Sequence, residues 1–229
     1  NSCAIESTNA YIGSYNETTE EFEEDELTVA ELDRLHRFYR LWKKTGWTIP
    51  QLDIVLQAIK ETSGNPIISA TLVELGEVFR LGNSLMIEPE EVIAWTYGLD
   101  NTSYNDKDSY YASLFLNKAL VSPNEQNLLD NFDPSATPGT VLDLTDTGVQ
   151  ALVRAVIGVN ENEYSELGAF YSGSTISIDN LSKVYGISQL CKKVGASISD
   201  FITYNSLTGY TPAAGGFGAS APADLITFI

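Results

Sequence analysis

The fold of this chain is decided by residues 28–59, which read TVAELDRLHRFYRLWKKTGWTIPQLDIVLQAI. In the first half, apolar residues recur at the three- and four-residue spacing that gathers side chains on one face of an α-helix: Leu32, Leu35, Phe38, Tyr39 and Trp42. Thr28 followed by Glu31 is the pattern of a capping box, so we expect the helix to begin there. Gly46 is expected to end it.

A second helix is predicted directly after this glycine. Thr48 and Gln51 repeat the capping-box pattern, and Pro50 is tolerated because it falls in the first turn. Apolar residues then continue at helical spacing: Leu52, Val55, Leu56 and Ile59. The whole stretch is therefore predicted to be a helical hairpin.

The hairpin pattern recurs along the chain. A shift of 40 residues carries Leu32, Leu35, Arg40, Leu41 and Leu52 onto Leu72, Leu75, Arg80, Leu81 and Val92. A shift of 149 carries Leu32, Leu41, Lys43, Lys44, Gly46, Ile49 and Leu52 onto Leu181, Leu190, Lys192, Lys193, Gly195, Ile198 and Phe201. A weaker copy at a shift of 112 aligns Gly46 with Gly158 and Thr48 with Asn160.

The cap positions of these copies agree best. The residues Thr48, Glu88, Asn160 and Ser197 are followed three residues later by Gln51, Glu91, Glu163 and Asp200. An acceptor at the cap and an acidic or amide group three residues on both suit the unpaired backbone donors of a helix start. We therefore expect an internal repeat, with copies near residues 27–60, 67–100, 145–172 and 177–207.

These copies predict an all-α fold with little or no sheet over residues 27–229. A single hairpin cannot bury its apolar face alone, so we expect the repeated helical hairpins to stack in an irregular solenoid-like bundle. The longest gap between copies holds a predicted short helix at residues 108–120 and a Pro-rich loop excursion at residues 121–141. Residues 212–222 are rich in Gly and Ala and are expected to form a loop.

The chain is strongly acidic. It has 31 Asp and Glu residues against 13 Lys and Arg, and the formal net charge of −18 disfavours nucleic acid and anionic lipid as partners. Residues 1–26 hold eight of the acidic residues and no Lys or Arg. We expect this segment to be an extended or loosely ordered leader.

The cysteines and the lengths of the apolar runs show which kinds of covalent and membrane structure to expect. The two cysteines, Cys3 and Cys191, are too few for a disulfide framework, and both are predicted to be free thiols. No run of about 18 apolar residues predicts a transmembrane helix. Residues 1–3 contain no initiator Met and open no signal peptide, so we interpret the chain as a piece of a longer polypeptide.

The sequence contains no recognisable catalytic, cofactor-binding or metal-binding set, so we expect neither an enzyme nor a cofactor. The single histidine, His36, lacks the partners that a metal site or a catalytic triad needs. The segment Asp100–Asp108 has the composition of a calcium loop but not its central Gly and terminal Glu. The tryptophans fall in or beside the apolar pattern and are predicted to be core residues: Trp42, Trp47 and Trp95.

Basic residues gather on the exposed side of the first predicted helix: Arg34, Arg37, Arg40, Lys43 and Lys44. Two interpretations stay open for them. They form a docking face, or they pair with the acidic leader just upstream.

Three pieces of the chain carry a resemblance to a known family. They are residues 32–42 with their continuation through Gly46-Trp47 to Leu52-Asp53, residues 114–120, and the copy that runs from Leu181 through Gly195 to Phe201. These pieces resemble the A subunit of bacterial insecticidal toxin complexes (Tc toxins). The resemblance spans about residues 27–229 and implies that the segment belongs to the helical shell of that subunit.

The resemblance implies a function for the whole A subunit rather than for a single site. In this family the A subunit forms a homo-pentamer around a translocation channel, binds a host-cell receptor and delivers a toxic enzyme supplied by partner subunits. The segment would then be part of a secreted or cell-surface virulence factor. It would contact the rest of its parent subunit and help to house the channel of a pore-forming assembly, without inserting into the membrane itself.

Two other classes of function stay open. A helical-repeat scaffold for protein–protein interaction would bind a peptide or protein along a concave face. The 72-residue interval between the second and third caps departs from the constant repeat length expected of such a scaffold. An enzyme of an unrecognised fold would need a cluster of polar residues that the sequence does not reveal.

Overall fold

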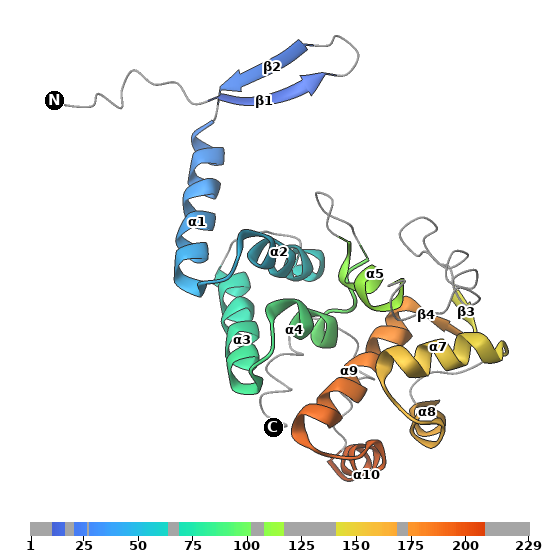
Figure 1. Cartoon of the computed structure of the whole chain (residues 1–229). Helices are drawn as coiled ribbons and strands as arrows, with labels where there is room; N and C mark the ends of the chain where they lie inside the picture. The colour runs from blue at the N-terminus through green and yellow to red at the C-terminus, as the bar shows by residue number, and fades with distance from the viewer. Residues whose placement is uncertain are drawn as a thin grey trace. The chain divides into compact units, whose positions relative to one another are not determined.

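The computed structural model describes residues 11–16, 21–26, 28–63, 69–101, 108–116, 141–168 and 174–208. Helices dominate this part of the chain (Figure 1): α1 Val29–Thr45, α2 Ile49–Ser63, α3 Ser69–Leu85, α4 Pro89–Thr96, α5 Tyr110–Phe115, α7 Thr147–Ile157, α8 Glu161–Leu167, α9 Ile178–Val194 and α10 Ile198–Thr208. The predominantly helical class predicted from the sequence is therefore confirmed.

Two short antiparallel strand pairs accompany the helices. In the first, β1 (Tyr11–Asn16) pairs with β2 (Glu21–Glu26), so a β-hairpin lies within the segment predicted as an extended or loosely ordered leader. In the second, β3 (Val141–Asp143) pairs with β4 (Thr175–Ser177). Since β3 precedes α7 and β4 leads directly into α9, this pairing brings the starts of the two helices together.

The chain divides into two compact units, residues 1–52 and residues 53–229. The boundary falls inside α2, whereas the sequence places a boundary after residue 26. The predicted excursion at 121–141 lies outside the described residues except for residue 141, and so do Cys3, residues 102–107 of the calcium-like segment and the Gly- and Ala-rich segment.

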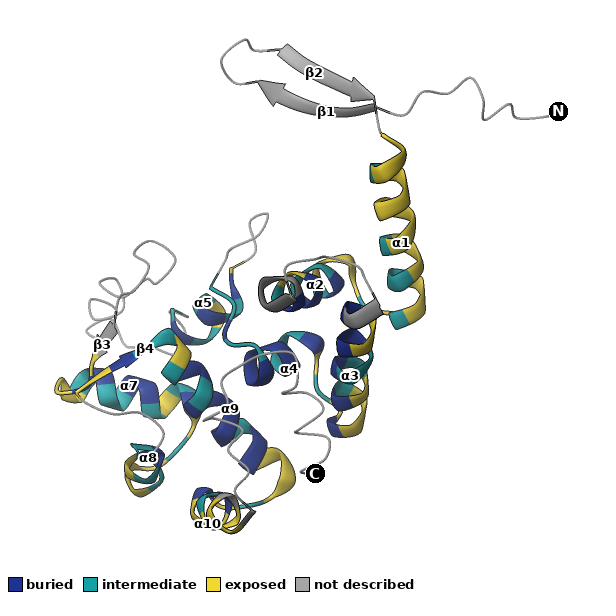
Figure 2. Ribbon diagram, turned by 180° about the vertical axis from the view of Figure 1, so that it is seen from behind, coloured by how far each residue is buried: buried dark blue, intermediate teal, exposed yellow. Residues whose placement is uncertain are grey.

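In the first unit, α1 begins and ends where the sequence predicts. The Glu31 backbone N–H donates to Thr28 Oγ1 over 3.3 Å, and the Thr28 backbone N–H donates to Glu31 Oε2 over 2.8 Å, which completes the capping box. At the other end the N–H of Gly46 donates to the carbonyl of Trp42. The predicted apolar stripe lies on the helix, but no residue of α1 is buried (Figure 2). Within the described part of the first unit, no element covers this stripe.

The second unit is organised around α9. This helix packs against α4, α7, α10 and β4, and it is buried around most of its circumference (Figure 2). Gly186 lets the backbone of α4 approach closely, because a Cβ at this position would lie 3.3 Å from the Cα of Trp95. The Leu99 backbone N–H donates to Ser182 Oγ over 2.9 Å in the same contact. Small residues on α9 thus set the packing distance between α4 and α9.

The hairpins share one turn geometry. The residue that closes the first helix is left-handed in all four copies, with φ of 72° at Gly46, 53° at Met86, 68° at Gly158 and 73° at Gly195. In three copies the N–H of the next residue bonds the carbonyl five residues back, as in a Schellman motif: Ile87 to Gly82, Val159 to Arg154 and Ala196 to Cys191. The four predicted copies therefore share a left-handed turn residue, and three of them share the hydrogen bond that follows it.

The second helix of each hairpin then begins with the predicted cap. Reciprocal hydrogen bonds join the cap residue to the residue three positions later in three copies: Thr48 with Gln51, Asn160 with Glu163 and Ser197 with Asp200. The capping boxes predicted there are confirmed. In the second copy Glu88 makes no side-chain cap bond, so that part of the prediction is wrong. Pro89 follows it and fixes the backbone of the first turn instead.

Met86 is the only non-glycine with a left-handed backbone among the described residues, and its side chain is exposed. We predict that Met86→Gly raises the free energy of unfolding by about 0.5–1 kcal/mol, because relief of the left-handed strain exceeds the extra entropy of glycine in the unfolded chain. The matched reverse change is Gly195→Ala, where a Cβ meets no atom within 4 Å. It should lower stability by about 1 kcal/mol from backbone strain alone.

Urea denaturation followed by circular dichroism measures both changes. If Met86→Gly proves neutral or destabilising while Gly195→Ala destabilises, the turn at residue 86 does not carry the strain assigned to it.

Candidate interaction surfaces

The described residues contain no group of three or more His, Cys, Asp or Glu side chains placed to hold a metal ion. None of the described helices is both long and apolar enough to cross a membrane. His36 lies exposed on α1.

The basic residues of α1 are all exposed, as predicted: Arg34, Arg37, Arg40, Lys43 and Lys44. Arg37 pairs with Asp33 one turn earlier on the same helix, with the guanidinium 2.7 Å from the carboxylate. Both side chains of this pair are about half exposed, so it contributes little to stability. The acidic side chains of residues 1–26 are not described, so ion pairs between them and these basic residues are not tested. The basic residues of α1 can therefore form either a docking face or ion pairs with that acidic segment.

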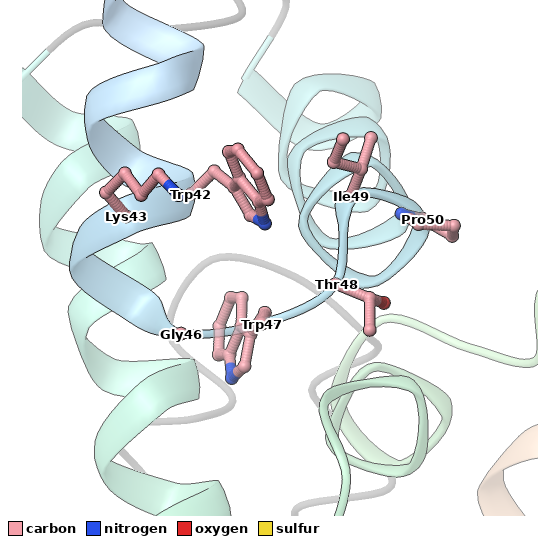
Figure 3. Close-up of a pocket in the computed structure, with 7 residues that line it drawn as sticks. All are labelled: Trp42, Lys43, Gly46, Trp47, Thr48, Ile49 and Pro50. Carbon is pink, nitrogen blue, oxygen red and sulfur yellow. The ribbon is translucent and has the colours of Figure 1, made fainter.

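An open hollow lies at the turn between α1 and α2 (Figure 3). Its lining is Trp42, Lys43, Gly46, Trp47, Thr48, Ile49 and Pro50, and we call it the Trp42–Trp47 hollow. Of the three tryptophans predicted for the core, Trp95 is buried, which confirms that prediction. Trp42 and Trp47 are only half-buried and line the hollow instead.

The aromatic side of this hollow carries a positive charge. The Lys43 ammonium lies 4.1 Å from the centre of the Trp42 ring system and 5.5 Å from that of Tyr39. Tyr39 and Trp42 themselves meet edge to face at 5.7 Å. Thr48 is engaged in its capping box, so its hydroxyl is not poised as a nucleophile. Such a surface suits an apolar or acidic side chain of a protein partner better than a chemical reaction.

A second feature is the joint between the third and fourth hairpins. The carbonyl oxygen of Ile157, the last residue of α7, accepts from three side chains of α9: Ser188 Oγ at 2.9 Å, Gln189 Nε2 at 3.1 Å and Lys192 Nζ at 2.6 Å. A helix C-terminus carries partial negative charge and unpaired carbonyls, so an ammonium and two neutral donors stabilise it. Burial lowers the pKa of Lys192, and the charge of Glu163 opposes that effect.

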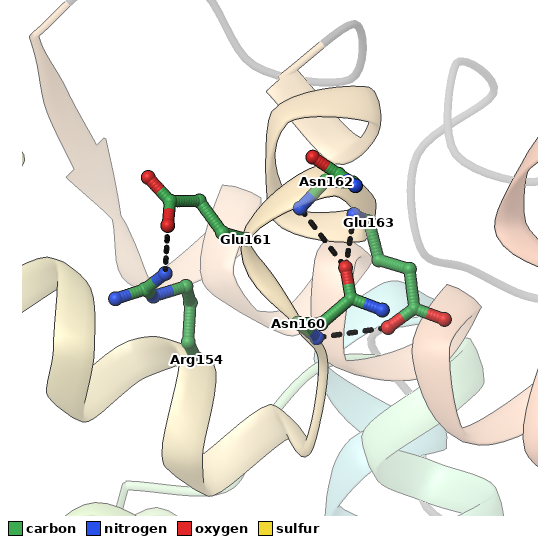
Figure 4. A network of polar contacts seen from close by, with 5 residues as sticks. All are labelled: Arg154, Asn160, Glu161, Asn162 and Glu163. Atoms are coloured by element: carbon green, nitrogen blue, oxygen red, sulfur yellow. Dashed lines mark hydrogen bonds and ion pairs between the residues drawn. The ribbon is translucent and has the colours of Figure 1, made fainter.

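The polar network beside this joint belongs to the turn between α7 and α8 (Figure 4). Asn160 Oδ1 accepts from the backbone N–H groups of Asn162 and Glu163, and the Asn160 N–H donates to the Glu163 carboxylate. The Arg154 guanidinium lies 3.5 Å from the Glu161 carboxylate. These contacts cap the ends of two helices, so we interpret the network as structural.

Two hydrogen-bonded pairs that contain tyrosines lie in the second unit and resemble acid–base pairs, but they do not fit that role. Tyr110 Oη lies 3.1 Å from Tyr185 Oη, and Tyr97 Oη donates to the Glu74 carboxylate over 3.2 Å. Burial raises the pKa of both Tyr97 and Tyr110 well above the ordinary value, and neighbouring carboxylates add to the shift. The phenols therefore stay protonated at neutral pH and hold the elements together.

The cysteine in the described part is Cys191, which is buried on α9. Burial and, to a smaller extent, the charges of Glu163 and Asp200 together raise the pKa of its thiol to about 11. A thiol needs a lowered pKa and access to solvent to act as a nucleophile, and Cys191 has neither.

Comparison with known proteins adds no relative to this picture: no protein-family model matches the chain, and no curated protein matches its sequence.

The joint at Ile157 is testable by a double-mutant cycle. A Cβ at Gly158 would collide with the Lys192 ammonium, so Gly158→Ala should displace it from the Ile157 carbonyl as well as strain the turn. We predict a loss of about 2 kcal/mol for Gly158→Ala and only about 1 kcal/mol for the same change in a Lys192→Met background. Equal losses in both backgrounds, measured by urea denaturation, would show that Lys192 does not stabilise this helix end.

The protection of Cys191 gives a separate prediction, in a Cys3→Ser variant that leaves one thiol. A pKa of about 11 leaves about one thiolate in a thousand at pH 8, and burial blocks access as well. Ellman's reagent should therefore react with the native variant at least a thousandfold more slowly than with free cysteine, and fully once urea unfolds it. Rapid reaction of the native variant would contradict the burial of Cys191.

Proposed function

We propose that this chain is a structural segment built from stacked helical hairpins, and that it forms part of the shell of the A subunit of a bacterial toxin complex. The observation that carries the structural half of the proposal is the recurrent turn. Four hairpins share the same left-handed closure, and the third and fourth are joined through the Ile157 carbonyl. The toxin-complex half rests on the resemblance of residues 27–229 to that subunit.

Stacking explains why the hairpins need one another. In the third and fourth copies α7 packs against α9 and α8 packs against α10, so each helix of one pair meets its counterpart in the next. This is how an irregular solenoid-like bundle buries apolar side chains that no single pair can cover. In a shell, such a stack acts as a wall, and its contribution is rigidity rather than chemistry.

In this proposal the chain is neither an enzyme nor the membrane-inserting element. Its partners are the rest of the parent A subunit and, through the full-length protein, the other members of a homo-pentamer. Toxin-complex partner subunits and the host-cell receptor bind elsewhere on the assembly, which is secreted or held at the bacterial surface. The toxic cargo passes through the channel that the shell encloses.

A helical-repeat interaction scaffold is the second candidate. The Trp42–Trp47 hollow favours it, because half-buried aromatic residues beside exposed basic residues are typical of protein-binding surfaces. A scaffold of this kind would act as a monomer that binds its partner along one face, without a channel.

Electron microscopy of the parent polypeptide tests the choice. We predict fivefold particles around a central channel, with antibody fragments raised against residues 53–208 decorating the outer wall. The pure 229-residue chain should leave dye-loaded liposomes intact at acidic, neutral and alkaline pH, whereas the parent protein should release the dye. Particles without a channel would contradict the shell assignment, and dye release by the chain alone would contradict its passive role.

A further inference from the structure

Two neighbouring lysines at the end of α9 bond to the turns of two different hairpins. Lys192 Nζ donates to the Ile157 carbonyl over 2.6 Å, at the turn between α7 and α8. Lys193 Nζ donates to the Met86 carbonyl over 3.3 Å, at the turn between α3 and α4. Consecutive residues of an α-helix lie about 100° apart around its axis, so one helix can reach two neighbours at once. We call Lys192 and Lys193 the lysine pair.

The two turns occupy equivalent places in the predicted repeat. A shift of 72 residues carries Met86 onto Gly158 and the cap position Glu88 onto Asn160. Both Met86 and Gly158 have a left-handed backbone. The lysine pair therefore contacts the same kind of turn twice, once in the second predicted copy and once in the third.

A glutamate accompanies each of the two turns. The same shift carries Glu91, in the first turn of α4, onto Glu163, in the first turn of α8. Burial raises the pKa of Glu91, and the positive charge of Lys193 opposes that effect. Burial lowers the pKa of Lys192, and the negative charge of Glu163 opposes that effect. Each lysine is thus attracted by the carboxylate of the turn to which it donates its hydrogen bond.

The body of α9 is fastened to the same two hairpins. The helix lies between α4 and α7 and packs on both (Figure 1). Toward the second hairpin, Ser182 Oγ accepts from the backbone N–H of Leu99. Toward the third, Ser188 and Gln189 donate to the Ile157 carbonyl. Because α9 runs as one helix from Ile178 to Val194 and is closely packed, a shift that loosens one of these contacts disturbs the other.

We propose that the lysine pair makes α9 a coupling element, so that the turn of the second hairpin and the turn of the third open together. Opening at one turn releases one lysine and lets α9 shift. The same shift draws the other lysine away from its carbonyl. The coupling depends on contacts within the second unit alone, and it holds whether or not the chain belongs to a toxin complex.

Four variants of the full chain test the coupling. Lys193→Met removes the bond to the Met86 carbonyl and keeps Lys192, and Lys192→Met does the reverse. Methionine keeps an unbranched side chain but has neither the charge nor the donor. Lys183→Met makes the same substitution earlier on α9 and is the control for lost charge. Lys193→Arg keeps both the charge and a donor, so it should behave as the parent chain.

Native-state hydrogen exchange of the backbone amides in α4 and α7 gives the outcome. We expect Lys192→Met and Lys193→Met each to speed exchange in both helices by about three- to tenfold, because each variant loses one charge-assisted hydrogen bond of the shared contact. The factors for α4 and α7 should agree within about twofold in each variant. The urea dependence of this exchange should stay below that of global unfolding. Lys183→Met should exchange as the parent chain does.

Independent turns would give a different pattern. Faster exchange in α4 alone for Lys193→Met, or in α7 alone for Lys192→Met, would overturn the proposal, because each lysine would then hold only its own turn. Unchanged exchange in both helices would overturn it as well. So would an acceleration that carries the full urea dependence of global unfolding, or one that Lys183→Met reproduces, since a general loss of stability would then explain the result.

Discussion

The last carbonyl groups of an α-helix have no hydrogen-bond donor within their own helix. In the second unit of this protein, the packing of α7 on α9 depends on which donors the last carbonyl of α7 receives. The Ile157 carbonyl takes three donors from α9, which converts an unpaired helix end into a fixed contact between two hairpins. The left-handed residue Gly158 turns the chain away immediately afterwards and leaves room for the lysine ammonium. Packing of α8 on α10 and the β3–β4 pair complete the joint.

The same turn explains both the regularity and the irregularity of the fold. The turn of each hairpin needs a residue with a left-handed backbone, followed by the N-cap of the second helix. Glycine occupies the left-handed position in three copies, where it has the lowest conformational cost. The second copy uses Met86 and a proline after the cap position, and it still reaches the same backbone. Different residues therefore satisfy one geometric requirement, so the four turns agree more closely in backbone than in sequence.

Local features of this fold were predictable from sequence, and long-range ones were not. The helix starts at Thr28, Thr48, Asn160 and Ser197 follow from side chains that act within four residues, so spacing alone reveals them. For the apolar stripe of α1, periodicity shows that a face is apolar but not whether another helix covers it. The three donors around the Ile157 carbonyl lie more than thirty residues away in the chain, and no short motif marks them. The equivalence of Lys43 and Lys192 in the repeat was the available signal.

Native-state hydrogen exchange measured by mass spectrometry tests the central claim, that consecutive hairpins are held as one cooperative unit through this joint. The decisive quantity is the free energy of opening for backbone amides in α7 compared with those in α9. The joint predicts that the two helices open together, with protection factors that agree within about tenfold and fall in parallel as urea is added. Exchange of α7 several orders of magnitude faster than that of α9 would contradict the account, because the third hairpin would then open without disturbing the fourth.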